Sequence, residues 1–117
     1  MASYSKQILS GSTNGRVIPV AATATPGTTI HTALASPTID EVYLFASNTD
    51  TSDQTLTIEW GGVTDPGDHV CKAYVIPAKS PPIPVVTGLV LTGALVIKAF
   101  SGSASKINIS GFVNRIS

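Results

Sequence analysis

Gln54-Thr55-Leu56-Thr57-Ile58-Glu59-Trp60 is the stretch of sequence that decides the fold class. Its apolar side chains, Leu56, Ile58 and Trp60, occupy every second position, and polar side chains occupy the positions between them. Because successive side chains of a strand point to opposite faces, this alternation predicts a strand with one face in the core and the other in water. Glu59 is expected on the wet face.

Short segments of the same kind follow one another along the chain, each closed by turn-forming residues. Charged residues make up only 12% of the chain, about half the share usual in soluble domains. The expected strands cover residues 16–23, 28–34, 39–47, 54–60, 69–76, 83–86, 94–100 and 106–116. No segment repeats its apolar residues with the spacing of a helix. We therefore predict an all-β fold, an antiparallel β-sandwich of the jelly-roll kind with about eight short strands.

Two parts of this pattern carry more specific expectations. Pro81, Pro82 and Pro84 lack amide hydrogens, so the segment at 83–86 is expected to be an edge strand or an extended crossing and not a central strand. The last two strands flank the five-residue stretch 101–105, which is typical of a hairpin loop. We therefore expect these two strands to pair with each other.

The first fifteen residues differ from the rest of the chain because they contain few apolar side chains. Ile8 and Leu9 are the only sizeable aliphatic residues after Met1. Such a segment buries too little apolar surface to offset the entropy that it loses on ordering. The sequence therefore predicts an extended, flexible N-terminal arm over 1–15 and a single β-sandwich domain over 16–117.

Charge and cysteine content argue against several classes of partner and location. Seven basic and seven acidic residues give a net charge of zero, and the basic residues are scattered, so we expect neither nucleic acid nor a membrane as a partner. Cys71 has no second cysteine to pair with, and the first residues lack the apolar core of a signal peptide, which together favour cytoplasmic synthesis. The uncharged stretch 83–97 falls short of the roughly 20 apolar residues of a membrane-spanning helix.

Candidate metal ligands gather in one part of the sequence. Asp65, Asp68, His69 and Cys71 lie close together, and His31 is the only other histidine. A closed zinc site needs four ligands, and the chain offers no second pair with ligand spacing. We favour a polar turn followed by a strand and expect no metal.

The polar stretch that begins at Asn48 has some features of a calcium-binding loop. Oxygen-bearing side chains occupy alternate positions up to Gln54, and Glu59 is the twelfth residue in the same frame. The sixth position is Asp53, where an EF-hand needs glycine for its sharp turn. A hairpin loop is the preferred interpretation.

The residue types used in hydrolysis are present, but their spacing fits no catalytic pattern. A Ser-His-Asp site would have to use His31 or His69, and the chain contains no Gly-x-Ser-x-Gly sequence. Asp40 and Glu41 are adjacent on an expected strand, so their carboxylates face opposite sides and do not form a glycosidase pair. We expect no enzymatic activity, no cofactor and no small-molecule substrate.

Trp60 is the only tryptophan and directly precedes two glycines. Burial as an anchor of the core is the preferred interpretation. The alternative is a ligand-binding loop in which Trp60 acts with Asp65, Asp68 and His69.

Four segments of the chain resemble small virion proteins of tailed bacteriophages. The segments are Tyr4-Ser5-Lys6-Gln7-Ile8-Leu9-Ser10-Gly11-Ser12, Ile39-Asp40-Glu41-Val42-Tyr43-Leu44-Phe45-Ala46-Ser47-Asn48, Leu56-Thr57-Ile58-Glu59-Trp60-Gly61-Gly62 and Ile109-Ser110-Gly111-Phe112-Val113-Asn114-Arg115-Ile116. None of these segments is a chemical motif.

The resemblance implies a structural protein on the outer surface of the phage head, most like a capsid decoration (cement) protein made in the host cytoplasm. It implies a homotrimer that binds the major capsid protein across its subunits. The residues expected to contact the capsid are Tyr4, Lys6, Gln7, Ile8 and Leu9 of the arm. The residues expected at the self-association surface are Ile83, Val85, Val86, Leu89 and Leu91.

Two alternatives remain open at this point. The first is a component of the tail, the baseplate or the head-to-tail junction. The second is a receptor- or carbohydrate-binding module displayed on the particle, with Trp60 and the following loop as its site.

Overall fold

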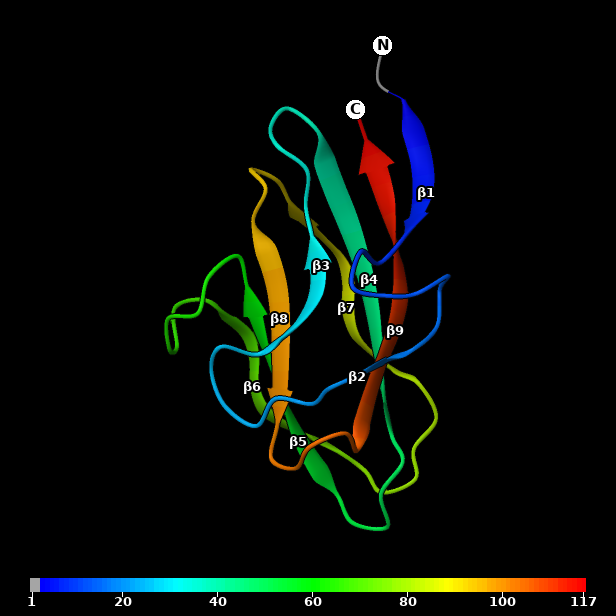
Figure 1. Cartoon of the computed structure of the whole chain (residues 1–117), viewed down its shortest axis with the longest axis vertical. Coiled ribbons are helices and arrows are strands. Elements are labelled where there is room, and N and C mark those ends of the chain that lie inside the picture. Colours follow the sequence, from blue (N-terminus) through cyan, green and yellow to red (C-terminus); the bar gives the residue numbers. More distant parts are fainter. Residues whose placement is uncertain (1–2) are drawn as a thin grey trace.

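The computed structural model describes residues 3–117, which form nine strands and no helix (Figure 1). The strands are β1 (Tyr4–Ile8), β2 (Ile18–Pro19), β3 (Thr28–Thr32), β4 (Ile39–Asn48), β5 (Gln54–Trp60), β6 (His69–Ile76), β7 (Ile83–Leu91), β8 (Val96–Ser101) and β9 (Ile107–Ile116). Within this range there is accordingly no helix of the length and apolarity needed to cross a membrane. The prediction of an all-β fold is confirmed.

The strands form two antiparallel sheets that pack face to face. One sheet has the order β1-β9-β4-β7, with the short β2 also paired to β9, and the other has the order β3-β8-β5-β6. From β2 onward, only the connection from β5 to β6 stays within a sheet, and every other connection crosses to the opposite sheet. This is the strand order of a jelly roll, so the predicted sandwich is confirmed. β7 lies at a sheet edge, as its prolines predict.

The predicted hairpin between the last two strands is wrong. β8 pairs with β3 and β5, whereas β9 pairs with β1, β2 and β4 of the other sheet. The segment from Asn48 to Gln54 likewise joins β4 to β5 across the two sheets and is not a hairpin loop. A short polar connection has the same composition whether it turns within a sheet or crosses between sheets, so the sequence pattern does not separate the two cases.

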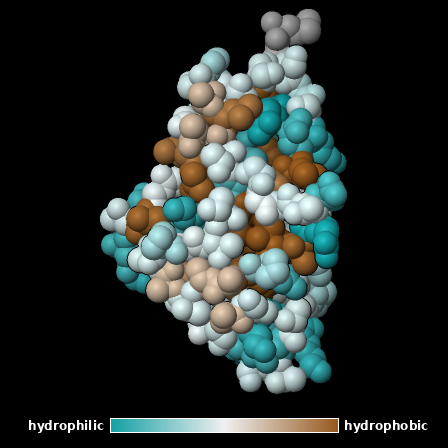
Figure 2. All heavy atoms as spheres, viewed as in Figure 1, coloured by the Kyte–Doolittle hydropathy of each residue, from teal (hydrophilic) through white to brown (hydrophobic). Residues whose placement is uncertain are grey.

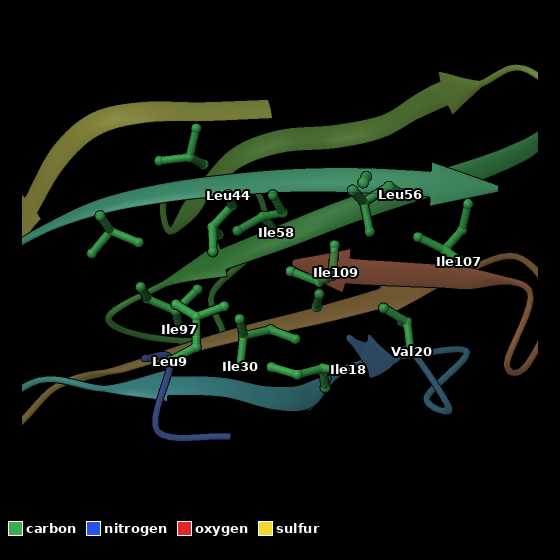
Figure 3. Packing of buried hydrophobic residues seen from close by; sticks show 14 of the residues in the cluster. Leu9, Ile18, Val20, Ile30, Leu44, Leu56, Ile58, Ile97, Ile107 and Ile109 are labelled. Atoms are coloured by element: carbon green, nitrogen blue, oxygen red, sulfur yellow. The ribbon is translucent and has the colours of Figure 1, made fainter. Parts of the chain in front are cut away.

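The core lies between the two sheets, and alternation is clearest in β4 and β8, where every second residue is buried. Figure 3 shows side chains from both sheets, among them Leu44, Leu56, Ile58 and Ile109, pointing toward one another. The buried apolar residues are Leu9, Ile18, Val20, Ile30, Ala33, Val42, Leu44, Ala46, Leu56, Ile58, Ile76, Val86, Leu91, Ile97, Ala99, Ile107, Ile109 and Val113. On the face that carries β3 and β8, the apolar residues form separate small patches between polar ones (Figure 2).

The polar face of β5 is covered at one end, contrary to the prediction of a wet face. Glu59 is fully buried. Its carboxylate accepts hydrogen bonds from the Thr25 hydroxyl (2.6 Å) and from the backbone N–H of Gly27 (2.7 Å). The loop between β2 and β3 therefore lies over this end of β5, and the carboxylate fixes that loop to the sheet.

The N-terminal segment is part of the sheet and not a loose arm. Residues 4–8 form β1, which pairs in regular antiparallel register with Phe112 to Ile116 of β9. The next residue, Leu9, is 1% exposed and belongs to the core. The prediction fails here because a strand is held on a neighbouring strand by its backbone groups, which need no apolar side chains.

Candidate functional site

Several exposed apolar side chains lie on the edge strands β6 and β7. Val70, Tyr74 and Val75 of β6 and Leu89 and Val90 of β7 are large hydrophobic residues with much of their surface in water. We call these five residues the apolar edge surface. β6 and β7 lie at the edges of different sheets on the same side of the sandwich. Val75 lies opposite Thr55 and Val90 lies opposite Glu41, so these two side chains point to the outer sides of different sheets and the surface extends around this edge.

A shallow hollow of about 200 Å³ lies between the two edge strands. Cys71 and Tyr74 line it from β6, and Pro84 and Val85 line it from β7. Burial raises the pKa of the Cys71 thiol, whose Sγ lies 3.6 Å from the carbonyl oxygen of Leu56. The thiol therefore stays protonated at neutral pH and behaves as a small apolar side chain.

Of the five predicted self-association residues, three are exposed or partly buried and two are buried. Leu89 is exposed, and Ile83 and Val85 are partly buried against the core. Val86 and Leu91 are buried, so the prediction that these two residues lie on a surface is wrong. An edge strand still sends part of its side chains into the core, because successive side chains of any strand point to opposite faces of the sheet.

The three β6 residues of the apolar edge surface were missed in the sequence. Val70, Tyr74 and Val75 belong to an apolar run that also contains the buried Ile76. No signal in the sequence marks them, because their orientation depends on the bulge at Ala73, where φ is +52° and the backbone N–H bonds to the Thr57 hydroxyl (2.9 Å). A bulge changes which residues face outward, so simple alternation no longer assigns the faces.

The residues predicted to contact a capsid occupy different environments. Tyr4, Lys6 and Ile8 are exposed, and Gln7 is partly buried. Leu9 is buried in the core, so the prediction that it contacts a partner is wrong. Four of the five residues of β1 are therefore exposed, and only Gln7 is partly covered.

A stack of side chains links β1 to the neighbouring strands of its sheet. The Lys6 amine lies 4.7 Å from the centre of the Phe112 ring on β9. The Phe112 ring stacks in turn on Tyr43 of β4, with the ring centres 4.8 Å apart. The Tyr43 hydroxyl donates to Glu41 (3.0 Å), which raises the pKa of the tyrosine. The stack links three adjacent strands and draws the lysine toward its own sheet.

The predicted ligand loop does not form a single site. Trp60 is partly buried against the core. Asp65 binds the Lys72 amine (2.7 Å), which lowers the pKa of Asp65, and an Asp68 carboxylate oxygen accepts the Thr64 N–H (3.0 Å). These contacts fix the loop in place. A hollow of about 210 Å³ beside the loop is lined by Gly61, Gly62, Val63, Ala94, Leu95, Val96 and Lys98, and by none of the predicted ligand residues.

His69 is the fourth residue of that predicted loop. Its side chain is 5% exposed and lies edge-on to the Phe100 ring, with the ring centres 6.3 Å apart. Its Nδ1 is 3.6 Å from Asp65 Oδ1, which is too long for a hydrogen bond. His69 thus packs against the sheet and does not point into the hollow beside the loop.

A buried ionic network joins the two sheets at the end of the sandwich that carries β1. His31 of β3 and Asp40 of β4 are both fully buried, and His31 Nε2 lies 2.7 Å from Asp40 Oδ2. Arg115 of β9 donates to both carboxylate oxygens of Asp40, at 2.8 and 3.1 Å. Burial alone would raise the pKa of Asp40, but the hydrogen bonds from Arg115 and His31 and the charge of Arg115 outweigh it and hold the pKa below its usual value.

The histidine in this network has both ring nitrogens occupied. The backbone N–H of Ser10 donates to Nδ1 (3.0 Å), so the ring proton is on Nε2 and is donated to Asp40. The Ser10 hydroxyl oxygen accepts the N–H of Thr32 (2.7 Å) and is not directed at the histidine. The His-Asp pair therefore holds the N-terminal segment and the two sheets together, and has no serine nucleophile beside it.

The polar stretch from Asn48 to Gln54, which shares some features with a calcium-binding loop, is held by local hydrogen bonds. Asn48 Oδ1 accepts the Asp50 N–H (2.9 Å), and the Asp50 carboxylate accepts from Thr51 N–H (2.8 Å) and the Gln54 amide (2.6 Å). These bonds lower the pKa of Asp50 and shape the crossing loop. Among residues 3–117, no group of three or more His, Cys, Asp or Glu side chains is placed to hold a metal ion.

No protein-family model, curated protein or solved structure matches the chain. The functional conclusion therefore depends on the sequence resemblance and on the surfaces described above.

Proposed function

We propose that the chain is a structural protein of a tailed-phage particle, which decorates and stabilises the capsid by binding across capsid subunits. The observation that carries the proposal is the apolar edge surface on β6 and β7. The proposal is also supported by the resemblance of the four sequence segments to small virion proteins. The function lies in the surfaces that the sandwich presents to its neighbours.

The apolar edge surface suits a permanent contact. Two bulged edge strands hold its side chains on a rigid sandwich, so little entropy is lost when a neighbour covers them. Each square ångström of apolar surface removed from water contributes about 25 cal/mol. With a net charge of zero, the chain brings no long-range repulsion to a crowded protein shell.

The mechanism that we propose is mechanical. This mechanism does not use a free N-terminal arm. In the structure, β1 is held on its sheet by its backbone pairing with β9 and by the Lys6–Phe112 stack. The apolar edge surface contacts a neighbouring capsid subunit, and the exposed side of β1 remains available for a second contact. Binding at junctions between subunits resists their separation by the pressure of packaged DNA.

The first test is to locate the protein in images of the intact particle. Density on the outer surface of the head in hundreds of copies is the expected result. A dozen or fewer copies at the tail, the baseplate or the head-to-tail junction would contradict decoration and select the alternative.

The second test compares two matched substitutions. Val75 on the apolar edge surface is 51% exposed, and Val17, next to β2, is 50% exposed. Val75→Asp should reduce attachment to particles at least tenfold, whereas Val17→Asp should leave attachment unchanged. Equal attachment of the two variants, both folded by circular dichroism, would remove the apolar edge surface from the mechanism.

A further inference from the structure

The outer edge of β1 offers unpaired backbone groups at every second residue. Ser3 and Ser117 exchange two backbone hydrogen bonds, of 2.7 and 2.9 Å. Bonded and non-bonded pairs alternate along an antiparallel ladder, so residues 5 and 7 also bond to β9. The N–H and C=O groups of Tyr4, Lys6 and Ile8 therefore point away from β9. In Figure 1, no strand formed by residues 3–117 lies beyond β1.

Among the edge strands of five or more residues in the described part of the chain, β1 is the only one that pairs without a register shift. The pairings of β3 with β8, β6 with β5 and β7 with β4 all contain register shifts. The pairing of β1 with β9 runs from Tyr4 to Ile8 without a shift. Bulges twist an edge and prevent another strand from pairing with it, whereas a regular edge accepts a strand.

We propose that β1 pairs with β1 of a second copy of this chain, antiparallel and centred on Lys6. In this register Lys6 lies opposite Lys6 of the second copy, and Tyr4 lies opposite Ile8. Each of these pairs exchanges two backbone hydrogen bonds through the outward-pointing groups. The two five-stranded sheets become one continuous sheet across a twofold axis.

The side chains of β1 fit a second copy of the same strand. Tyr4 is 74% exposed and Ile8 is 50% exposed. Centred pairing brings each Tyr4 against an Ile8, and aromatic–aliphatic cross-strand pairs of this kind stabilise sheets. Both exposed residues become covered on both copies at once, which no other register of this short strand achieves.

Charge does not oppose this pairing. Lys6 is the only side chain on β1 that is charged at neutral pH, and its amine is drawn back over Phe112 of its own sheet. The two lysines in the middle of the interface are thereby kept apart. The net charge of zero means that two copies do not repel each other at a distance.

The dimer goes beyond the proposed function and does not depend on it. It replaces the trimer that the sequence resemblance implies. A dimer also carries the apolar edge surface twice, so a neighbour bound by one copy raises the effective concentration of the other.

Two substitutions of Lys6 separate the contribution of its backbone N–H to dimerisation from that of its side chain. Lys6→Pro removes the outward N–H and leaves the bonds to β9 in place, because proline is accepted at an edge position whose N–H faces solvent. Lys6→Ala removes the amine and keeps the N–H. We expect wild type and Lys6→Ala to sediment as dimers and Lys6→Pro to dimerise at least tenfold more weakly. A monomeric or trimeric wild type, or equal dimerisation of the two folded variants, would overturn the proposal.

Cross-linking supplies an independent measurement if Lys6→Pro does not fold. In a Cys71→Ser background, Lys6→Cys places two cysteines in a hydrogen-bonded pair with Cα atoms about 5.5 Å apart, which a disulfide can span. Gln7→Cys is the control, since it lies opposite Ser5 in the proposed register. We expect rapid disulfide formation for Lys6→Cys alone. Absence of this cross-link, or equally fast cross-linking of the control, would refute the register.

Discussion

Replacing Asp40 with asparagine should destabilise the protein severely, because the change leaves buried donors without a charged acceptor. The Asp40 carboxylate is fully buried and accepts from Arg115 and His31. Asparagine has the same shape, but its amide would present N–H groups to these donors. Removing one partner of a buried ionic network costs about 3–5 kcal/mol, a large part of the about 5–15 kcal/mol that stabilises a typical domain.

Urea unfolding at pH 7 measures this loss. With a slope of about 2 kcal/mol per molar urea, the midpoint should fall by about 2 M. The control is Asp65→Asn, which breaks an exposed ion pair with Lys72 and should leave the midpoint almost unchanged. A loss below about 1 kcal/mol for Asp40→Asn would refute the structural role that we assign to the network.

The pH dependence gives a second check of the same substitution. The folded protein holds the pKa of Asp40 below 3.8, so the ionised carboxylate stabilises the fold at pH values above this. The contribution is lost as the pH falls through the lower, folded-state pKa. The difference in stability between wild type and Asp40→Asn should therefore be full near pH 7 and shrink below pH 3.8. A difference that does not change with pH would show that the charge of Asp40 does not contribute.

Two further predictions concern packing. Leu9→Ala should cost about 2–5 kcal/mol in unfolding free energy by denaturant titration, because it empties a core position; a loss like that of an exposed residue would mean that the N-terminal segment does not belong to the core. Gly111→Ala should lower the melting temperature by more than 5 °C, since a Cβ at this position would collide with the Tyr43 carbonyl oxygen and φ is +152°. An unchanged melting temperature would show that β4 and β9 separate easily at this point.

The alternation of apolar and polar side chains in β5 was enough to predict an all-β fold, because this alternation follows from the local geometry of a strand. Leu56 and Ile58 are in the core as predicted. The burial of Glu59 was not predictable in the same way, since the loop that covers it lies 32 to 34 residues earlier in the chain. Local patterns assign a residue to a face, but they do not tell what lies over that face.

The candidate surface was predictable only in part. The uncharged stretch in β7 drew attention to Leu89, but the same stretch includes the buried Val86 and Leu91. The contribution of β6 depends on the bulge at Ala73, which no composition signal marks. The position of β1 at a sheet edge required the pairing with β9, which joins the two ends of the chain.

The hydrogen bonds between Ser3 and Ser117 have a practical consequence for engineering. Because these residues are neighbours in space, a linker of a few residues could connect them and allow circular permutation. New ends could then be opened in the exposed turn at 64–67, between β5 and β6. Such a permutant would keep the jelly-roll fold, and a peptide or reporter fused to the new ends would be displayed at the turn between β5 and β6.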